Sequence, residues 1–389
     1  MKKTIKDVDV GGKSVLVRAD FNVPLENGKV TDDFRIRATL PTIQYLIGKG
    51  ARIILCSHLG RPGGEVVEDL RLDPVAARLA DLLDQRVPKT DDCVGAQAQQ
   101  AVDDLQPGQV LLLENTRFHP GEKANDPDFA AQLAHGADLY ANDAFGAAHR
   151  AHASTEGVAH ILPAVAGLLM ARELEILGRV REHPSHPFVA ILGGAKISDK
   201  IEVVNQLLDQ VELLMVGGGM ANTFLRARGL ETGDSLVEED SLDTAREILD
   251  RAGDSLILPV DAVIADAFEA DATHRTVPVD EVPAGWQILD VGQGTIDLFK
   301  DKLATAKMVM WNGPLGVFEM PAFAHGTMAL AKALAELDAE TITGGGETAA
   351  AVSQAGVVDQ LSHVSTGGGA FLTFMEGSKL PGVEALQDK

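Results

Sequence analysis

Short apolar runs alternate with segments of helical periodicity along the first half of this chain. Each run ends in a polar turn, and apolar residues then recur at the i, i+3 and i+4 spacing of an amphipathic helix. The strands predicted by this pattern are 14–19, 52–57, 110–113 and 139–142. The predicted helices are one that is capped at 31–33 and runs to about 48, one at 72–83 and one at 128–134. Strands and helices in this order predict βαβ units and a parallel sheet.

The second half repeats the alternation after a long helical run at 165–181 and a proline-containing loop at 182–187. The strands expected there are 188–192, 211–216, 255–258, 308–311, 341–343 and 363–365. The sequence therefore predicts an α/β fold of two doubly wound, Rossmann-like parallel-sheet lobes, which are joined by a helix and have a cleft between them.

The composition agrees with two soluble domains and argues against some classes of binding partner. The chain has 389 residues, of which 45% are hydrophobic and 23% charged, and this length favours about two domains. A formal net charge of −23 argues against nucleic acid or an anionic membrane as a partner. There are only two cysteines, and no segment is apolar enough to span a bilayer, so we expect a cytoplasmic protein.

Near the middle of the chain, an apolar run breaks at two glycines and is followed by two lysines. The run 189–192 reads as a buried strand, and 198–208 reads as a helix. Lys196 and Lys200 would then lie on the same side of the first helical turn. Glycines let a ligand approach the backbone, and helix N-termini attract anions. The alternatives are a phosphate-binding turn and an ordinary strand-to-helix turn with two solvated lysines.

Arginines follow the predicted strands of the first lobe. The segments that close these strands are 18–24, 57–62, 114–119 and 142–150, and each contains an arginine. Ligands of parallel α/β sheets bind at the carboxyl ends of the strands. A single arginine there is usually a solvated cation, but several on one edge of a very acidic chain favour a pocket for an anionic small molecule.

In the second lobe, glycine clusters take the same positions at the ends of strands. They lie at 217–219, 292–294, 313 and 344–346, beside predicted helix starts. Bare backbone N–H groups at helix starts receive phosphates. Each cluster alone is a weak signal, but together with the two lysines they predict a nucleotide site. One lobe with an anion pocket and another with a nucleotide site indicate a phosphoryl transferase.

Other motifs do not fit. No glycine cluster matches G-x-G-x-x-G, which disfavours an NAD-dependent dehydrogenase. His149 and His152 have a spacing that metal ligands can have, but no cysteine or carboxylate cluster accompanies them, so structural or substrate-facing roles are favoured.

Eight motifs together make the chain closely resemble the phosphoglycerate kinase family over essentially its whole length. They are RADFNVP (18–24), SHLGRP (57–62), LENTRF (113–118), NDAFGAAHRAH (142–152), ILGGAKISDK (191–200), WNGPLGVFE (311–319), GGGETAA (344–350) and HVSTGGGA (363–370). The resemblance implies reversible phosphoryl transfer between 1,3-bisphosphoglycerate and MgADP, giving 3-phosphoglycerate and MgATP, in glycolysis and gluconeogenesis. It also implies a monomer that closes about a hinge.

The resemblance implies a domain plan and a set of site residues. The plan is a phosphoglycerate-binding domain at 1–164, a hinge helix at 165–182, a nucleotide-binding domain at 183–369, and a tail at 370–389 that returns to the first domain. The phosphoglycerate-binding residues would be Asp20, Phe21, Asn22, Arg35, His58, Leu59, Gly60, Arg61, Arg117 and Arg150. The nucleotide-binding residues would be Gly193, Gly194, Ala195, Lys196, Lys200, Gly292, Asn312, Glu319, Gly345, Gly346, Glu347 and Thr348.

Among these residues, the groups expected around the transferred phosphoryl group are Arg35, Lys196, Lys200, Gly345 and Gly346. Most members of the family carry Asp at the position of Glu347, where the carboxylate binds Mg²⁺. Glutamate is one methylene longer, while Mg²⁺ demands near-octahedral geometry. We expect Glu347 to serve as the metal ligand with the ion displaced slightly. A catalytically silent nucleotide-binding relative is the remaining alternative.

Overall fold

A computed structural model describes residues 1–389 and divides the chain into two compact units. Unit 1 comprises Met1–Leu177 and Gly377–Lys389, and unit 2 comprises Gly178–Glu376. The division falls within helix α6 (Leu168–Glu182). The helices of the chain are too short or too polar to cross a membrane.

A five-stranded parallel sheet forms the centre of unit 1, in the order β5-β4-β1-β6-β7. Its strands are β1 (Ser14–Arg18), β4 (Arg52–Cys56), β5 (Val110–Leu112), β6 (Leu139–Asn142) and β7 (Ala164–Ala166). The other elements of unit 1 are the hairpin β2 (Leu25–Glu26) and β3 (Lys29–Val30), and the helices α1 (Phe34–Gly48), α2 (Asp73–Leu83), α3 (Gly95–Asp103), α4 (Pro120–Ala124), α5 (Pro127–Leu133) and α14 (Pro381–Glu384). β1 is buried along its whole length, as expected for a strand covered on both faces.

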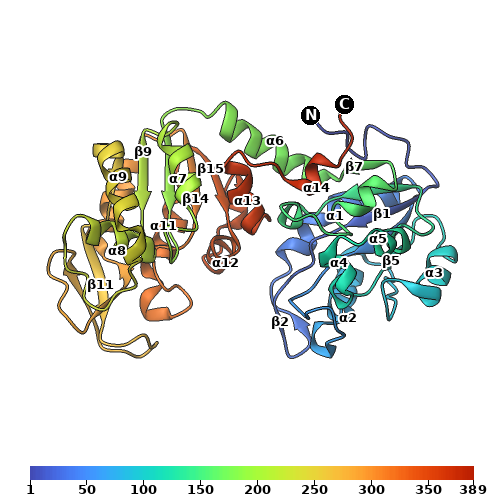
Figure 1. Ribbon diagram of the computed structural model, residues 1–389, viewed down its shortest axis with the longest axis horizontal. Coiled ribbons are helices and arrows are strands. Elements are labelled where there is room, and N and C mark those ends of the chain that lie inside the picture. The colour runs from blue at the N-terminus through green and yellow to red at the C-terminus, as the bar shows by residue number, and fades with distance from the viewer. The chain divides into compact units, whose positions relative to one another are not determined.

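Both termini belong to unit 1 and lie near each other (Figure 1). The backbone N–H of Lys3 donates to Gln387 O at 2.8 Å, and the N–H of Lys389 donates to Met1 O at 3.0 Å. Asn142, at the end of β6, donates from its side chain to Gly382 O at 3.0 Å. The last residues of the chain are therefore part of the first structural unit.

Unit 2 has a six-stranded parallel sheet in the order β10-β9-β8-β14-β15-β16, with helices on both sides (Figure 1). Its strands are β8 (Phe188–Leu192), β9 (Leu213–Val216), β10 (Leu256–Ile257), β14 (Met308–Asn312), β15 (Glu340–Gly344) and β16 (His363–Val364). The helices are α7 (Ile201–Leu208), α8 (Gly218–Ala227), α9 (Leu242–Ala252), α10 (Gln293–Leu303), α11 (His325–Ala335), α12 (Gly346–Gln354) and α13 (Gly368–Met375). β8 and β14 are fully buried strands beside each other.

The predicted α/β class and parallel sheets are confirmed, but three details of the prediction are wrong. The helical run expected from 165 begins only at Leu168, because Ala164–Ala166 pairs with β6 as an edge strand. The helix expected from 198 begins at Ile201. Unit 2 also contains an antiparallel sheet that the pattern did not reveal, formed by β11 (Asp261–Ala265), β12 (His274–Pro278) and β13 (Gln287–Val291).

Hydrogen bonds to two side chains of unit 1 anchor the start of α6. The backbone N–H groups of Leu169 and Met170 donate to Asp143 Oδ1 at 2.9 and 3.1 Å, and Leu168 N–H donates to Thr42 Oγ1 at 2.9 Å. The chain reaches this anchor through Gly167, where a Cβ would lie 2.0 Å from Asp143 Oδ1. Only glycine fits such an approach without displacing the carboxylate.

We therefore expect Gly167→Ala to destabilise unit 1 by about 1–3 kcal/mol, the usual cost of overpacking. Calorimetric unfolding would measure this change. Gly178→Ala, within α6, is the control, because no atom lies within 4 Å of its added Cβ. This control should be neutral or stabilising by up to about 1 kcal/mol. Equal effects of the two substitutions would contradict the steric argument.

Candidate functional sites

The parallel sheet of unit 1 brings the loops after β1, β4 and β5 together at one edge. Gly60 N–H donates to Asn22 Oδ1 at 2.9 Å, and Arg117 donates to Gly60 O at 2.7 Å. Arg35, which comes from α1, donates to Asn22 O at 2.8 Å and lies 3.6 Å from Asp20 Oδ2. The structure thus gathers these five sequence-predicted residues into one polar cluster.

Charges dominate this cluster. Burial, followed by the charges of Arg18 and Arg150, lowers the pKa of Arg117 to about 10. Burial opposes the ionisation of Asp20, but the charge of Arg35 and the other cations outweigh it and lower the pKa of Asp20. A cation whose pKa is lowered by burial and by neighbouring cations gains stability from an anion. The edge of the unit 1 sheet is therefore suited to a negatively charged ligand.

The remaining predicted residues of unit 1 differ in what they offer a ligand. Arg61 and Arg150 are exposed, and both are free to reach a ligand. Phe21 and Leu59 belong to the hydrophobic core, so only their backbone groups are available. His58 is almost fully buried, and its surroundings are described below.

Arg18 corrects a sequence-based expectation. It follows the pattern of strand-end arginines, but its side chain is only 1% exposed. Its Nε donates to Ser154 Oγ at 2.7 Å, and a terminal nitrogen lies 3.0 Å from His58 Nδ1. Arg18 therefore bonds to other residues in the interior of the site and does not contact a ligand itself. The sequence gives no sign of this, because it does not show which way a strand-end side chain points.

His149 and His152 lie close to the same cationic cluster. Burial and then the charge of Arg150 lower the pKa of His149, and burial lowers the pKa of His152 to about 4. Both imidazoles are therefore neutral at pH 7.

In unit 2, loops after β8, β14 and β15 meet at the carboxyl edge of the sheet. Lys200 Nζ donates to Gly193 O at 2.5 Å and to Asn312 O at 3.3 Å. Asn312 Nδ2 donates to Gly344 O at 2.6 Å, and Gly313 N–H donates to Thr348 Oγ1 at 2.7 Å. Three loops are thereby fixed around the Lys200 ammonium. An ammonium has three N–H donors, so the third remains for a ligand oxygen.

The two lysines differ more than the sequence predicts. Lys200 is 8% exposed and stands at the N-cap of α7, whereas Lys196 is exposed. They do not share a helical turn, because the segment between them is not helical. Burial lowers the pKa of Lys200 to about 8, although Glu347 and Asp199 oppose this shift.

Glycine is required where these loops cross. A Cβ at Gly193 would lie 2.1 Å from Pro314 O. Gly345 has φ of +105° and precedes the first residue of α12, Gly346. The absence of side chains leaves the N-terminus of α12 and its backbone N–H groups open to an anion.

A mostly apolar cavity of about 260 Å³ adjoins this cationic edge within unit 2. The predicted residues that line it are Gly194, Ala195, Glu319 and Glu347. Gly218 and Pro314, from two of the predicted glycine-containing turns, also line it, but the sequence analysis missed much of the wall, which includes Leu236, Phe268, Leu289 and Val291. Gly292 lies next to this wall and caps α10. The missed residues are apolar and come partly from the unpredicted antiparallel sheet, so no polar motif marked them.

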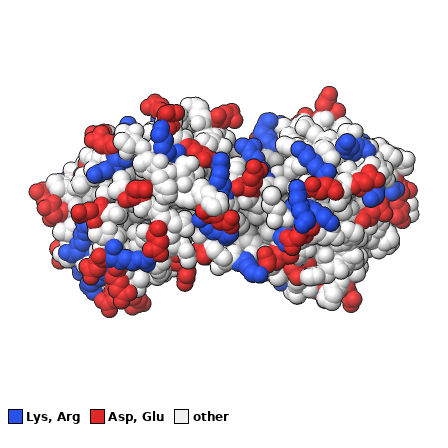
Figure 2. All heavy atoms as spheres, turned by 90° about the horizontal axis from the view of Figure 1, so that it is seen from above, with Lys and Arg blue, Asp and Glu red and all other residues white.

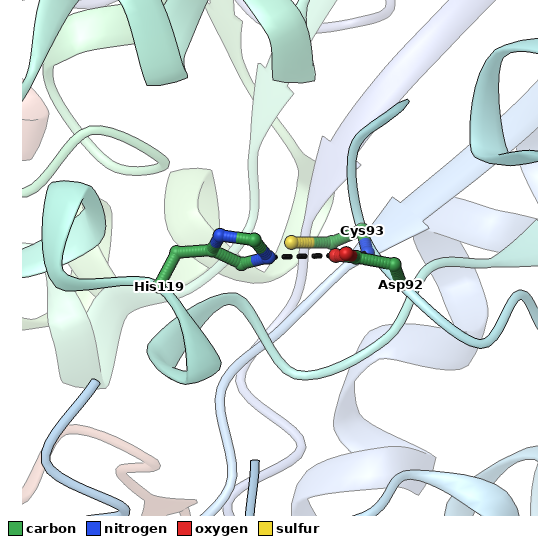
Figure 3. A group of neighbouring side chains, drawn as sticks. All are labelled: Asp92, Cys93 and His119. Atoms are coloured by element: carbon green, nitrogen blue, oxygen red, sulfur yellow. Dashed lines mark hydrogen bonds and ion pairs between the residues drawn. The ribbon is translucent and has the colours of Figure 1, made fainter. Parts of the chain in front are cut away.

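Asp92, Cys93 and His119 form a separate cluster, in which three potential metal-ligand atoms lie within 4.8 Å of one another (Figure 3). His119 Nε2 is 2.7 Å from Asp92 Oδ1, which also accepts from Cys93 N–H at 2.6 Å. Burial and then the charge of Asp92 raise the pKa of the Cys93 thiol, whereas a metal ligand is a thiolate. Asp92 is held by His119 and by the Cys93 backbone, and we assign the cluster to support of the loop before α3.

Comparisons with known proteins agree on one family. A family model described as phosphoglycerate kinase matches residues 5–378. Curated phosphoglycerate kinases from Moorella thermoacetica and Pelotomaculum thermopropionicum are 58% and 57% identical, each over 100% of both chains. Among solved structures, phosphoglycerate kinase from Coxiella burnetii gives a TM-score of 0.85 at 43% identity, with 99% of this chain and 98% of that chain covered. The enzyme from Pyrococcus horikoshii OT3 gives a TM-score of 0.89 at 33% identity, with the same coverage.

Proposed function

The chain belongs to the phosphoglycerate kinase family, and from this premise we propose which of its residues carry out the reaction. It is a phosphotransferase with a carboxyl group as acceptor, and it transfers a phosphoryl group reversibly between 1,3-bisphosphoglycerate and ADP. The observation that carries the residue assignment is the pairing of a cationic, strand-end cluster in unit 1 with a glycine-lined cationic edge beside an apolar cavity in unit 2.

We assign phosphoglycerate binding to the unit 1 cluster. The side chains of Arg35, Arg61, Arg117 and Arg150 supply guanidinium groups, which suit carboxylate and phosphate oxygens. Asp20 and Asn22 keep Arg35 in place, as the hydrogen bond to Asn22 O and the 3.6 Å approach to Asp20 indicate. Gly60 links the loops by bonding to Asn22 and Arg117.

We assign nucleotide binding to the carboxyl edge of the unit 2 sheet. The apolar cavity suits a flat purine base, and Glu319 at its wall suits a ribose hydroxyl. We assign Lys196, Lys200 and the N–H groups of Gly345 and Gly346 to the phosphate oxygens, which suit cations and helix N-termini. Asn312 and Thr348 act by holding the loops together through their bonds to Gly344 and Gly313.

Mg²⁺ is the cofactor that we propose to accompany the nucleotide. Glu347 fits this ion, because its carboxylate is exposed in the first turn of α12, lines the cavity and forms no salt bridge with a basic side chain. Magnesium is usually held by one or two carboxylates together with substrate phosphates and waters. When bound, the ion supplies positive charge to the phosphate oxygens of the nucleotide.

No general base is required in this mechanism. The attacking group in the ATP-consuming direction is a carboxylate, which is ionised at pH 7 because its unperturbed pKa is about 4. Catalysis then depends on positioning and on cations that neutralise the charge of the transferring phosphoryl group. We assign these charges to Arg35 of unit 1 and Lys200 of unit 2.

We also propose that the protein acts as a cytoplasmic monomer. Both cysteines are free and buried, as suits a reducing compartment. On the face shown in Figure 2, acidic and basic side chains are interspersed over the surface, and this pattern keeps an acidic protein from offering a continuous basic surface to nucleic acid.

The assignment is tested first by an assay that couples 3-phosphoglycerate, ATP and Mg²⁺ to NADH oxidation. We expect activity in the wild type and in Glu347→Asp, within about tenfold of each other, because both residues offer a carboxylate to the metal. Activity in the aspartate variant alone would mean that Glu347 disables the site. A lack of activity in both would favour a silent nucleotide-binding relative.

The Lys200 assignment predicts a pH dependence. Because burial lowers the pKa of this ammonium to about 8, kcat/KM for ATP should fall as the pH rises through about 8 and the amine loses its charge. Lys200→Arg keeps a charge at this pH. That variant should have a lower kcat/KM, but its kcat/KM should not fall as the pH rises through about 8. If the fall persisted unchanged in Lys200→Arg, the titration would belong to another group.

Arg35 and Lys200 belong to different units, so contact of both with one phosphoryl group depends on how the units are arranged during the reaction. We propose closure about α6 when both substrates are bound, which would also shield the acyl phosphate from water. Small-angle scattering should then show a smaller radius of gyration for the doubly liganded protein than for the free protein or either single complex. An unchanged radius would contradict closure.

A further inference from the structure

Arg18 is a buried cation for which the catalytic assignment has no use. Its guanidinium is 1% exposed and therefore cannot reach a substrate. Its contacts are Ser154 Oγ, the backbone carbonyl of Ala19 and one ring nitrogen of His58. Burying a charge is costly unless polar partners compensate it. Such a residue in the interior of a binding site calls for an explanation.

The contact between Arg18 and His58 determines where the imidazole proton lies. A terminal nitrogen of Arg18 is 3.0 Å from His58 Nδ1. A guanidinium has only donors and cannot be deprotonated in proteins. Nδ1 must therefore accept this bond with its lone pair, and the single proton of the neutral ring must sit on Nε2.

The alternative is a doubly protonated His58 whose Nδ1–H points to Asp20. That pair of atoms is 3.9 Å apart, which is too long for a hydrogen bond. Among the charged groups that face the ring, Asp20 alone favours the imidazolium. Burial and the cations Arg18, Arg117 and Arg35 lower the pKa of His58 well below its usual value.

A second pair of residues fixes Arg18 itself. Ser154 Oγ donates to Glu122 Oε1 at 2.6 Å, and Ser154 N–H donates to Glu122 Oε2 at 3.0 Å. A hydroxyl has one proton, so this bond turns the lone pairs of Ser154 towards Arg18 Nε, which donates to them at 2.7 Å. Glu122 is fully buried, and its carboxylate balances the charge of Arg18 through the serine.

We propose that Glu122 and Ser154 position Arg18 so that it holds His58 as the neutral, Nε2-protonated imidazole. His58 is then a permanent hydrogen-bond donor to an anionic oxygen of the phosphoglycerate, and it neither carries charge nor changes its proton at physiological pH. The ring nitrogen that Arg18 engages is Nδ1, and we assign the Nε2–H donor to the ligand. Arg18, Ser154 and Glu122 are positioning residues, and the role of the donor rests on the proposed binding of phosphoglycerate to unit 1.

The tautomer can be measured on the free protein by ¹⁵N NMR of labelled histidines. The chain has 11 histidines, and the spectrum of His58→Gln identifies the missing signal. We expect the pattern of an Nε2–H imidazole that does not change between about pH 6 and pH 8. An Nδ1–H pattern, or an imidazolium at pH 7, would overturn the proposal. This result does not depend on which substrate binds, so its failure is distinct from a failure of the proposed function.

Ser154→Ala tests the relay. Without the hydroxyl, Arg18 loses an acceptor, and we expect a mixture of His58 tautomers and a rise in KM for 3-phosphoglycerate of about tenfold, with KM for ATP unchanged. Thr90→Val is the matched control, because it removes a buried hydroxyl of unit 1 that donates to Asp92 O. A wild-type tautomer and KM in Ser154→Ala, or the same changes in both variants, would refute the relay.

Arg18→Lys supplies a second test that keeps the positive charge. The lysine ammonium lacks the planar fork that reaches Ser154 and His58 together. We expect the mixed tautomer and the raised KM for 3-phosphoglycerate here too. A single Nε2–H tautomer in this variant would show that charge alone sets the proton and would remove the need for the guanidinium geometry.

Discussion

Parallel strands end at the same edge of their sheet, and both candidate sites depend on this constraint. In unit 1 the loops after β1, β4 and β5 converge because those strands are neighbours in the order β5-β4-β1. In unit 2 the loops after β8, β14 and β15 converge for the same reason. Segments far apart in the chain, such as those of Gly193 and Asn312, therefore bond to the same ammonium. The order of the strands brings the loops together, and the side chains and backbone groups of the loops form the sites.

In each site a buried cation organises the loops around it. Lys200 donates to carbonyls of two loops of unit 2 and keeps one donor for a ligand. Arg18 uses its donors within unit 1, on Ala19, Ser154 and His58. The difference follows from their surroundings. Glu122 compensates Arg18 through a serine, whereas Lys200 lies on carbonyl oxygens and gains most from the arrival of a phosphate.

Much of the fold and of the site could be predicted from the sequence, and the errors have physical causes. The parallel strands were found because buried β8 and β14 read as unbroken apolar runs. The sequence pattern puts Val165 and Ala166 of the edge strand in a helix, because three small apolar residues carry no periodicity of their own. The antiparallel sheet was missed for a related reason. β12 is mostly exposed and rich in polar residues, so its sequence lacks the apolar pattern of a strand.

The sequence by itself determined the kinds of chemical group at each site, because motifs such as SHLGRP and GGGETAA fix residue type and order along the chain. Only the tertiary structure decided what each group does. It separated Arg18 from the exposed arginines and Lys200 from Lys196, since burial and hydrogen-bond partners depend on which segments meet in space. It also completed the apolar cavity with residues such as Leu236, Phe268 and Leu289, which lie in no motif. A spacing along the chain can indicate a ligand, but only packing sets the direction of a side chain and the position of its proton.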